Sequence, residues 1–249
     1  MNMDEILLSH LKDLSAKADR TGRFTFTDFL NLDEQNTLQI AGRELIRYEC
    51  FGGVAGCERV IARFGDPEEM GYEAPFPVVC VKISPLQQKF ADELSHRDIL
   101  GAVMNLGIER CCSGDIVLRD NVAYLFTLER IAPFICENLM KVKHTSVSCE
   151  VTDAPPEGEL FRTEALTVNV SSLRADCVVA AVWRLSRGNA EKLFAAQKVF
   201  INGRLTESCS AQLKENDIVS VRGTGRFVYK TVSGNSKKGR LFVEIEKYV

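Results

Sequence analysis

Hydrophobic residues along the 249-residue chain follow helical spacing in some segments and strand spacing in others, and this pattern divides the chain into three regions. The first region, residues 1–75, is predicted to be mixed and mainly helical. It contains amphipathic segments at about 4–18 and 33–47, and the glycine pair Gly52-Gly53 then breaks the pattern.

The second region, residues 76–156, alternates strand and helix patterns. Ile99, Val103 and Leu106 form the apolar stripe of one helix. The predicted elements are strands at about 78–83, 115–118, 122–127 and 144–151, and helices at about 95–105 and 131–140. This β-α-β-β-α-β order predicts a ferredoxin-like sandwich, which RNA-recognition modules share with many enzymes and regulators.

The third region, residues 166–249, follows a Pro- and Gly-containing linker at 153–158. Ser186 suits the N-cap of a second helix, and Asn202-Gly203 suits a tight hairpin turn that needs positive φ. The predicted elements are helices at 172–185 and after Ser186, and strands at about 166–171, 199–201, 217–221, 227–232 and 241–245. The expected fold class is therefore α+β.

Charge is distributed unevenly between these regions. Residues 166–249 carry 14 Lys and Arg against 7 Asp and Glu, a net charge of +7. Residues 1–165 carry 17 against 27, so the overall net charge of −3 conceals a basic module at the C-terminus. Such localised positive charge is typical of proteins that bind polyanions.

Several other classes of protein are disfavoured by composition. The chain has no apolar stretch of about 18 residues, and its N-terminus lacks the features of a secretory signal, so a cytoplasmic protein is expected. The nine cysteines include no Cys-x-x-Cys pair, which favours reduced and mostly buried thiols. A redox role for Cys111 or Cys112 is the alternative. No cofactor, metal site or catalytic residue is predicted.

One group of motifs in the third region is more specific. The segments Trp183–Phe194, Lys198–Gly203 and Leu213–Ile218 contain a Ser-Arg helix start, an Asn-Gly turn and an Asp-Ile strand entry. They resemble the alpha-L RNA-binding motif, also called the S-four domain. Gln197 and Asn216 stand where that motif usually has glycine. The chain therefore departs from the motif at two backbone turns.

The same segment predicts an RNA-contacting face on physical grounds. The start of the helix at Ser186 and Arg187 presents free N–H groups suited to phosphate. Arg187 and Lys198 are eleven residues apart, which on one helix is about 20° in azimuth, and Arg204 follows the turn. Arg187 or Lys192 alone could simply be solvated surface. The candidate RNA-binding residues are Ser186, Arg187, Lys192, Lys198, Arg204, Arg222, Arg226, Lys230, Lys237, Lys238 and Arg240.

A second resemblance covers nearly the whole chain. The segments 27–30, 51–59, 94–116, 220–227 and 237–240 are similar to signatures of the bacterial YlmH family. The resemblance implies a cytoplasmic RNA-binding protein, tied to the large ribosomal subunit and a peptidyl-tRNA during rescue of stalled nascent chains. It also implies a link to cell-division gene clusters.

The second region offers weaker candidates. Tyr124 and Phe126 alternate on one strand and could stack bases, although packing under the helices is the favoured interpretation. His96 and Asp115 could form an acid–base pair, but a structural or docking role is favoured for both.

The sequence therefore favours a non-catalytic RNA-binding factor whose partners are ribosomal RNA or tRNA and the large subunit. The protein partner of the acidic half is unknown. Two alternatives stay open: an RNA-modifying enzyme or its accessory, and a cell-division factor in which RNA binding is incidental.

Overall fold

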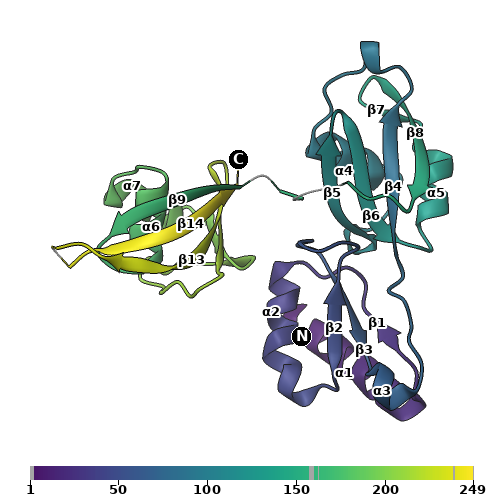
Figure 1. Ribbon diagram of the computed structural model, residues 1–249, viewed down its shortest axis with the longest axis horizontal. Helices are drawn as coiled ribbons and strands as arrows, with labels where there is room; N and C mark the ends of the chain where they lie inside the picture. The colour runs from purple at the N-terminus through teal and green to yellow at the C-terminus, as the bar shows by residue number, and fades with distance from the viewer. Residues whose placement is uncertain (1–2, 157–159, 162, 238, 249) are drawn as a thin grey trace. The chain divides into compact units, whose positions relative to one another are not determined.

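A computed structural model describes residues 3–156, 160–161, 163–237 and 239–248. The chain forms two compact units, residues 1–160 and 161–249, and each is a mixed α and β structure with antiparallel sheets (Figure 1). The predicted boundary between residues 75 and 76 lies inside the first unit and stays a prediction. Within the described residues, no helix is both long and apolar enough to cross a membrane.

The first unit begins with a small helical layer on a three-stranded sheet of order β1-β3-β2. Its elements are α1 (Met3–Thr21), β1 (Thr25–Phe26), α2 (Leu32–Ala41), β2 (Tyr48–Phe51), β3 (Ile61–Phe64) and α3 (Pro67–Met70). The prediction of a helix through residue 47 was wrong. The helix ends at Ala41, one 3-10 turn follows, and Tyr48–Phe51 hydrogen-bonds to β3 as a strand.

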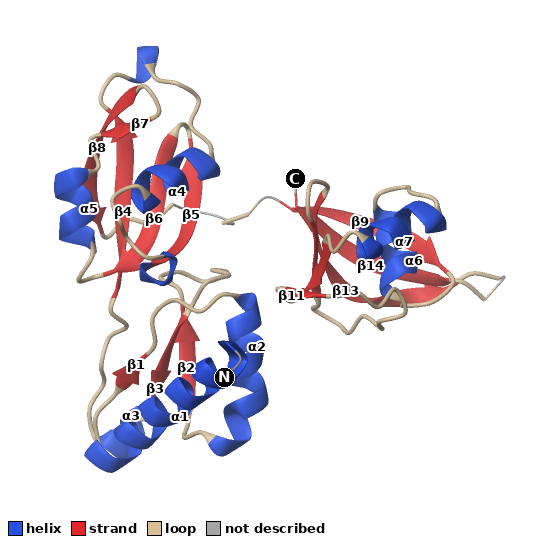
Figure 2. Cartoon of the chain, turned by 180° about the vertical axis from the view of Figure 1, so that it is seen from behind, coloured by secondary structure: helices blue, strands red, loops and turns tan. Residues whose placement is uncertain are grey.

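The second part of this unit is an antiparallel sheet of order β5-β6-β4-β8-β7, with α4 and α5 on one face (Figure 2). Its elements are β4 (Val78–Pro85), α4 (His96–Met104), β5 (Ser113–Arg119), β6 (Val122–Leu128), α5 (Ala132–Asn138), β7 (Lys141–Val142) and β8 (Thr145–Thr152). They follow the predicted order, and β7 is an additional two-residue strand. Ile99 and Val103 are fully buried, as the helical stripe predicts.

Close contacts join these two parts of the first unit. The Arg59 guanidinium donates to the carbonyls of Phe29 (3.0 Å), Arg110 (3.2 Å) and Ser113 (3.0 Å). The Phe29 ring lies so close to Gly114 that a Cβ there would be 2.6 Å from Cε1. The side chains and backbone of the two parts therefore interlock.

The second unit is a six-stranded antiparallel sheet of order β11-β10-β12-β13-β14-β9, with two helices packed on one face. Its elements are β9 (Thr163–Val170), α6 (Ala175–Val182), α7 (Arg187–Ala195), β10 (Val199–Ile201), β11 (Arg204–Leu205), β12 (Ile218–Val221), β13 (Gly225–Asn235) and β14 (Leu241–Tyr248). Its core contains Val178, Phe194 and Phe227, each fully buried. The first helix is shorter than predicted and covers Ala175–Val182.

Candidate nucleic-acid interface

The Asn-Gly turn of the second unit is fixed by a buried aspartate. Asn202 and Gly203 have φ of 50° and 80°, and they join β10 to β11 as the predicted hairpin turn. The Asn202 amide donates to Asp217 Oδ1 at 2.8 Å and accepts from the N–H of Ile218 at 2.8 Å. Asp217 Oδ2 also accepts from the N–H of Lys214 at 2.7 Å. The two motif segments therefore hold each other in place.

Two further turns explain the departures from glycine. Gln197 follows the end of α7 with φ of 54°, and Asn216 precedes β12 with φ of 69°. This is the left-handed region that glycine adopts without steric cost, and asparagine tolerates it better than most residues. The backbone thus has the turns that glycine would favour, although the side chains differ.

The start of α7 has the predicted cap. The Ser186 hydroxyl accepts from the N–H of Asn189 at 3.2 Å, and Arg187 is the first residue of the helix. Lys192 is exposed on the same helix. Lys198, however, does not share this helix, because α7 ends at Ala195 and the chain turns at Gln197. The predicted azimuthal alignment of Arg187 with Lys198 was therefore wrong.

Arg187 instead lies near Arg174, which is outside the predicted set of RNA-binding residues, because both contact Asp176. Buried Asp176 accepts from Arg174 Nε (3.0 Å) and Nη2 (2.9 Å), and its Oδ2 is 3.4 Å from Arg187 Nη2. Burial acts to raise the pKa of Asp176, but the hydrogen bonds and charge of Arg174 outweigh it and lower the pKa. Two guanidinium groups thus converge on one carboxylate, and the Arg187 side chain remains 58% exposed. We call Arg174, Asp176 and Arg187 the arginine pair site.

The arginine pair site has donor groups of the kind that an anion such as phosphate requires. Guanidinium groups present planar sets of N–H donors that match phosphate oxygens, and a carboxylate that orients them reduces the entropy lost on binding. Glu191, whose Oε1 is 3.5 Å from Arg187 Nε, competes for the same donors from the exposed surface. The sequence signal for Arg174 was its position two residues before Asp176, in the segment Arg174-Ala175-Asp176.

The remaining predicted cations fall on a different surface. Phe227 and Tyr229 of β13 are buried towards the helices, so the alternating Arg226 and Lys230 lie on the opposite face of the sheet. Arg226 Nε donates to Ser220 Oγ at 3.0 Å, and Lys230 Nζ is 3.5 Å from Glu246. The predicted residues are therefore divided between the two faces of the sheet and do not form one continuous cradle.

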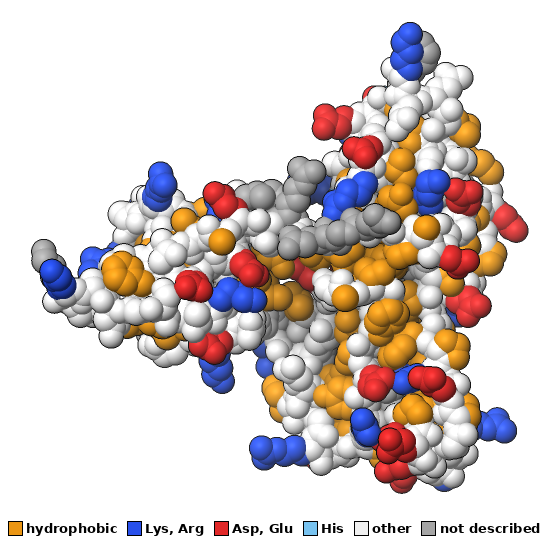
Figure 3. Space-filling view, in the orientation of Figure 1, with side chains coloured by type: hydrophobic (Ala, Val, Ile, Leu, Met, Phe, Trp, Pro, Cys, Tyr) orange, Lys and Arg blue, Asp and Glu red, His pale blue; other side chains and the backbone are white. Residues whose placement is uncertain are grey.

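Other members of the predicted set have individual surroundings. The backbone N–H of Arg222 donates to the carbonyl of Lys198 at 2.9 Å, and its guanidinium stacks 4.4 Å from the Phe200 ring centroid. Arg204 is half-buried on β11. Arg240 Nη2 donates to the Asn169 carbonyl at 2.8 Å, Lys237 is exposed in the same loop, and Lys238 lies outside the described residues. Lys and Arg side chains are interspersed with Asp and Glu on the visible face of this unit (Figure 3).

The five-stranded sheet of the first unit carries its own mixed surface. Tyr124 and Phe126 lie on the face of β6 opposite to buried Ala123 and Leu125, so packing under the helices was the wrong expectation for them. Phe126 is buried instead against the loop at Gly53, where a Cβ would be 2.3 Å from its ring. Tyr124 remains half-buried.

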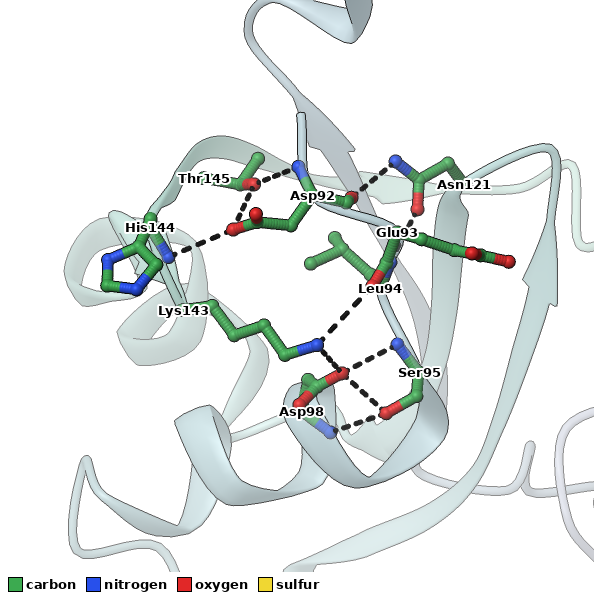
Figure 4. Close-up of polar contacts among 9 residues, drawn as sticks. All are labelled: Asp92, Glu93, Leu94, Ser95, Asp98, Asn121, Lys143, His144 and Thr145. Carbon is green, nitrogen blue, oxygen red and sulfur yellow. Dashed lines mark hydrogen bonds and ion pairs between the residues drawn. The ribbon is translucent and has the colours of Figure 1, made fainter. Parts of the chain in front are cut away.

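A polar network ties the β5–β6 turn and the β7–β8 turn of the same sheet to the segment before α4 (Figure 4). Asp92 Oδ2 accepts from His144 N–H and the Thr145 hydroxyl, both at 3.2 Å, while the Asn121 amide donates to the Asp92 carbonyl at 2.9 Å. Lys143 Nζ lies 2.7 Å from Asp98 Oδ2, which also accepts from Ser95 at the start of α4. These bonds hold three loops together, and Asp98 therefore has a structural role.

His96 and Asp115 have separate environments. Asp115 is buried and accepts from the N–H groups of Glu58 (2.5 Å) and Arg59 (3.2 Å). Burial raises the pKa of Asp115 above its ordinary value, and these two N–H groups partly oppose the rise. Burial also lowers the pKa of His96, with Arg110 contributing. The contacts of Asp115 serve to attach the loop before β3 to β5.

The nine cysteines are free thiols, and seven of them are half-buried. The expectation of mostly buried thiols was therefore too strong, since only Cys80 is buried. Burial, followed by the charge of Cys112, raises the pKa of Cys111 to about 12. A thiol with such a pKa is protonated at neutral pH, which disfavours a reactive thiolate.

Comparisons with known proteins agree with an RNA-binding class. Residues 72–155 match the family model described as the putative RNA-binding domain in YlmH. The chain is 29% identical over 234 residues to the ribosome-associated protein quality control protein P2 of Bacillus subtilis, covering 90% of this chain and 88% of that protein. Both similarities support the predicted relationship to the YlmH family.

A solved structure is also similar. The cell division protein ylmH from Streptococcus pneumoniae aligns with a TM-score of 0.48 and 23% identity, covering 61% of this chain and 93% of that chain.

Proposed function

We propose that this protein is a non-catalytic RNA-binding factor that associates with the large ribosomal subunit in the cytoplasm. Its C-terminal unit contacts the RNA backbone, and it acts when a nascent chain has stalled with its tRNA in place. The observation that carries this proposal is the arginine pair site, in which buried Asp176 orients Arg174 and Arg187 at the starts of α6 and α7. The name of the Bacillus subtilis relative supports the ribosomal context.

The proposed fold assignments support the same function. The second unit is an alpha-L domain, because its Asn202–Asp217 bond and its left-handed turns at Gln197 and Asn216 fit the motif's Asn-Gly and Gly-Asp positions. Residues 76–156 form a ferredoxin-like domain, supported by the strand order β5-β6-β4-β8 and by two helices on one face. Both folds commonly serve RNA recognition.

The proposed contacts are with the RNA backbone. The arginine pair site offers charge and N–H donors and no groove-reading element, which suits phosphate positioning more than base discrimination. The cations on the opposite face of the sheet, around Arg222 and Arg226, then meet a second stretch of RNA or its neighbouring tRNA. Binding through about five phosphates would give log K a slope of about −3 to −5 against log salt.

Co-sedimentation of the full chain with purified large subunits tests the proposal. The wild-type protein should migrate with the subunits, and the double variant Arg174→Glu/Arg187→Glu should stay in the supernatant. Arg43→Glu, at an exposed position of the first unit, is the control for charge reversal. Equal migration of all three proteins, or no migration of the wild type, would refute the proposal.

A further inference from the structure

The small sheet at the start of the chain has a hollow of about 710 Å³ beside the strand β2. The hollow lies between this strand and the segment that leads to β4. Its lining residues are Glu49, Cys50, Phe51, Arg63, Glu73, Ala74, Pro75 and Phe76. None of the predicted RNA-binding residues is among them.

The side chain of Arg63 forms the floor of the hollow and is held in place by its contacts. Arg63 is only 4% exposed, and its guanidinium carbon is 4.9 Å from the ring centroids of both Phe24 and Phe76. Its Nη2 donates to Glu49 at 2.6 Å, and its Nη1 donates to the Ala74 carbonyl. The charge of Arg63 is therefore compensated, and the two rings and the segment above it are fixed in position.

The wall of the hollow is apolar although it faces solvent. Phe51 is 38% exposed and lies 5.4 Å from Phe76 between ring centroids, and the exposed Pro75 continues the same surface. Contiguous exposed aromatic surface is unfavourable in water unless another apolar group covers it. The wall therefore suits an apolar side chain supplied from outside.

The strand beside the hollow is at the edge of its sheet. The order β1-β3-β2 pairs β2 with β3 on one side, and the residues from Glu49 to Phe51 are exposed. An edge strand presents backbone N–H and C=O groups that an extended peptide can pair with. Side chains of such a peptide alternate, so one of them would enter the hollow while its neighbours face the rim.

The charge around the hollow indicates which residues should flank the apolar residue of such a peptide. Glu49, which accepts from Arg63, and the exposed Glu73 stand at the rim. Residues 1–75 as a whole carry 14 Asp and Glu against 8 Lys and Arg, a net charge of −6. A cationic partner is therefore attracted, and an anionic one is repelled.

From these observations we infer that the hollow beside β2 binds an extended peptide in which an apolar residue is flanked by lysine or arginine. The peptide adds a strand to β2, places its apolar side chain against Phe51 and Phe76, and directs its basic side chains to Glu49 and Glu73. This interaction is separate from RNA binding by the C-terminal unit and stands or falls independently of it.

Fluorescence anisotropy with the full chain tests the inference. The probe is a labelled peptide, acetyl-Lys-Val-Lys-Leu-Lys-Val-Lys-amide, and its counterpart has glutamate in place of lysine. The lysine peptide should bind at least about tenfold more tightly than the glutamate peptide. Methylation of alternate backbone nitrogens, which blocks strand pairing, should weaken binding by about fivefold or more.

Phe51→Ser should weaken binding by about fivefold or more, because it removes the apolar wall. The matched control is Ile40→Ser on α2, where the side chain is 73% exposed and away from the hollow, and this variant should bind like the wild type. Circular dichroism checks that both variants are folded. Equal binding by the two variants, no preference between the two peptides, or no binding of the lysine peptide would overturn the inference.

Discussion

The carboxylate of Asp176 is fully buried and accepts two hydrogen bonds from the guanidinium of Arg174, at 3.0 and 2.9 Å. Arg187, eleven residues further on and in the next helix, approaches the same carboxylate at 3.4 Å. One buried negative charge therefore sets the positions of two surface cations. This relationship leads to the first two predictions.

Asp176→Asn should destabilise the C-terminal unit by about 2–4 kcal/mol, because it leaves two guanidinium groups without their shared counter-charge. Urea unfolding of the isolated variant and wild-type chains, followed by circular dichroism, measures this difference. The folded pKa of Asp176 is lowered, so its stabilising contribution is complete above the ordinary carboxyl pKa of about 4 and is lost as the pH falls through the lowered value. A wild-type and a variant chain with equal stability at pH 7 would contradict the assigned role.

The salt dependence of RNA binding should measure how many phosphate contacts Arg174 and Arg187 make. Each phosphate contact that is lost should reduce the magnitude of the slope of log K against log salt by about 0.7–0.9. Arg174→Gln/Arg187→Gln should therefore reduce the magnitude of the slope by the amount expected for about two lost phosphate contacts. Arg43→Gln should leave the slope unchanged. Filter binding to ribosomal RNA between low and physiological salt gives the slopes, and identical slopes for all three proteins would exclude the arginine pair from the interface.

The left-handed turns predict opposite effects of glycine at two asparagines. Asn216 and Asn202 have φ of 69° and 50°, but only Asn202 bonds to Asp217 and to the Ile218 N–H. Asn216→Gly should therefore leave stability unchanged or raise it by up to about 1 kcal/mol. Asn202→Gly should lower stability by about 1–3 kcal/mol, since the buried Asp217 loses a donor. Thermal unfolding compares the two variants. An equal loss of stability in both would contradict the structural role of the Asn202 side chain.

Two glycines of the first unit form another matched pair. A Cβ at Gly114 would lie 2.6 Å from the Phe29 ring, whereas a Cβ at Gly101 in α4 would have no neighbour within 4 Å. Gly114→Ala should destabilise the unit by about 1–3 kcal/mol or more through overpacking. Gly101→Ala should stabilise it by about 1 kcal/mol, because alanine favours a helix interior. If denaturant unfolding gives equal midpoints for the two variants, the close packing of Phe29 on β5 is not as described.

The non-catalytic proposal is tested by analysis of RNA modifications. Mass spectrometry of nucleosides from ribosomal RNA and tRNA of a deletion strain should give the same modified nucleosides as the parent strain. The loss of one modified nucleoside, restored by the wild-type gene, would instead favour the alternative of an RNA-modifying enzyme. A division defect without ribosome association would favour the third alternative.

Local patterns were sufficient to predict many elements. The Ser186 cap, the Asn202-Gly203 turn and the stripe of Ile99 and Val103 depend on neighbouring residues, and each is confirmed. The three-stranded sheet around β3 was missed because its strands have two to four residues, too few for a recognisable alternation. Its formation depends on pairing between segments far apart in sequence.

The predicted interface was only partly recoverable for the same reason. The positive charge of the third region and its motif were visible in the sequence, but the direction of each side chain depends on which face of the sheet the helices cover. That choice separates Arg187 from Arg226 and Lys230. Arg174 was not predicted, because its position beside Arg187 depends on the buried carboxylate of Asp176. Only the folded chain brings these three residues together.

Hydroxyl-radical footprinting of purified large subunits with the full chain tests the central claim most directly, because it reports protection of the sugar-phosphate backbone. A discrete set of protected ribosomal RNA nucleotides is expected with the wild type and with Arg43→Glu. This protection should disappear with Arg174→Glu/Arg187→Glu. An unchanged footprint with the double variant, or no footprint with the wild type, would contradict RNA contact by the arginine pair site.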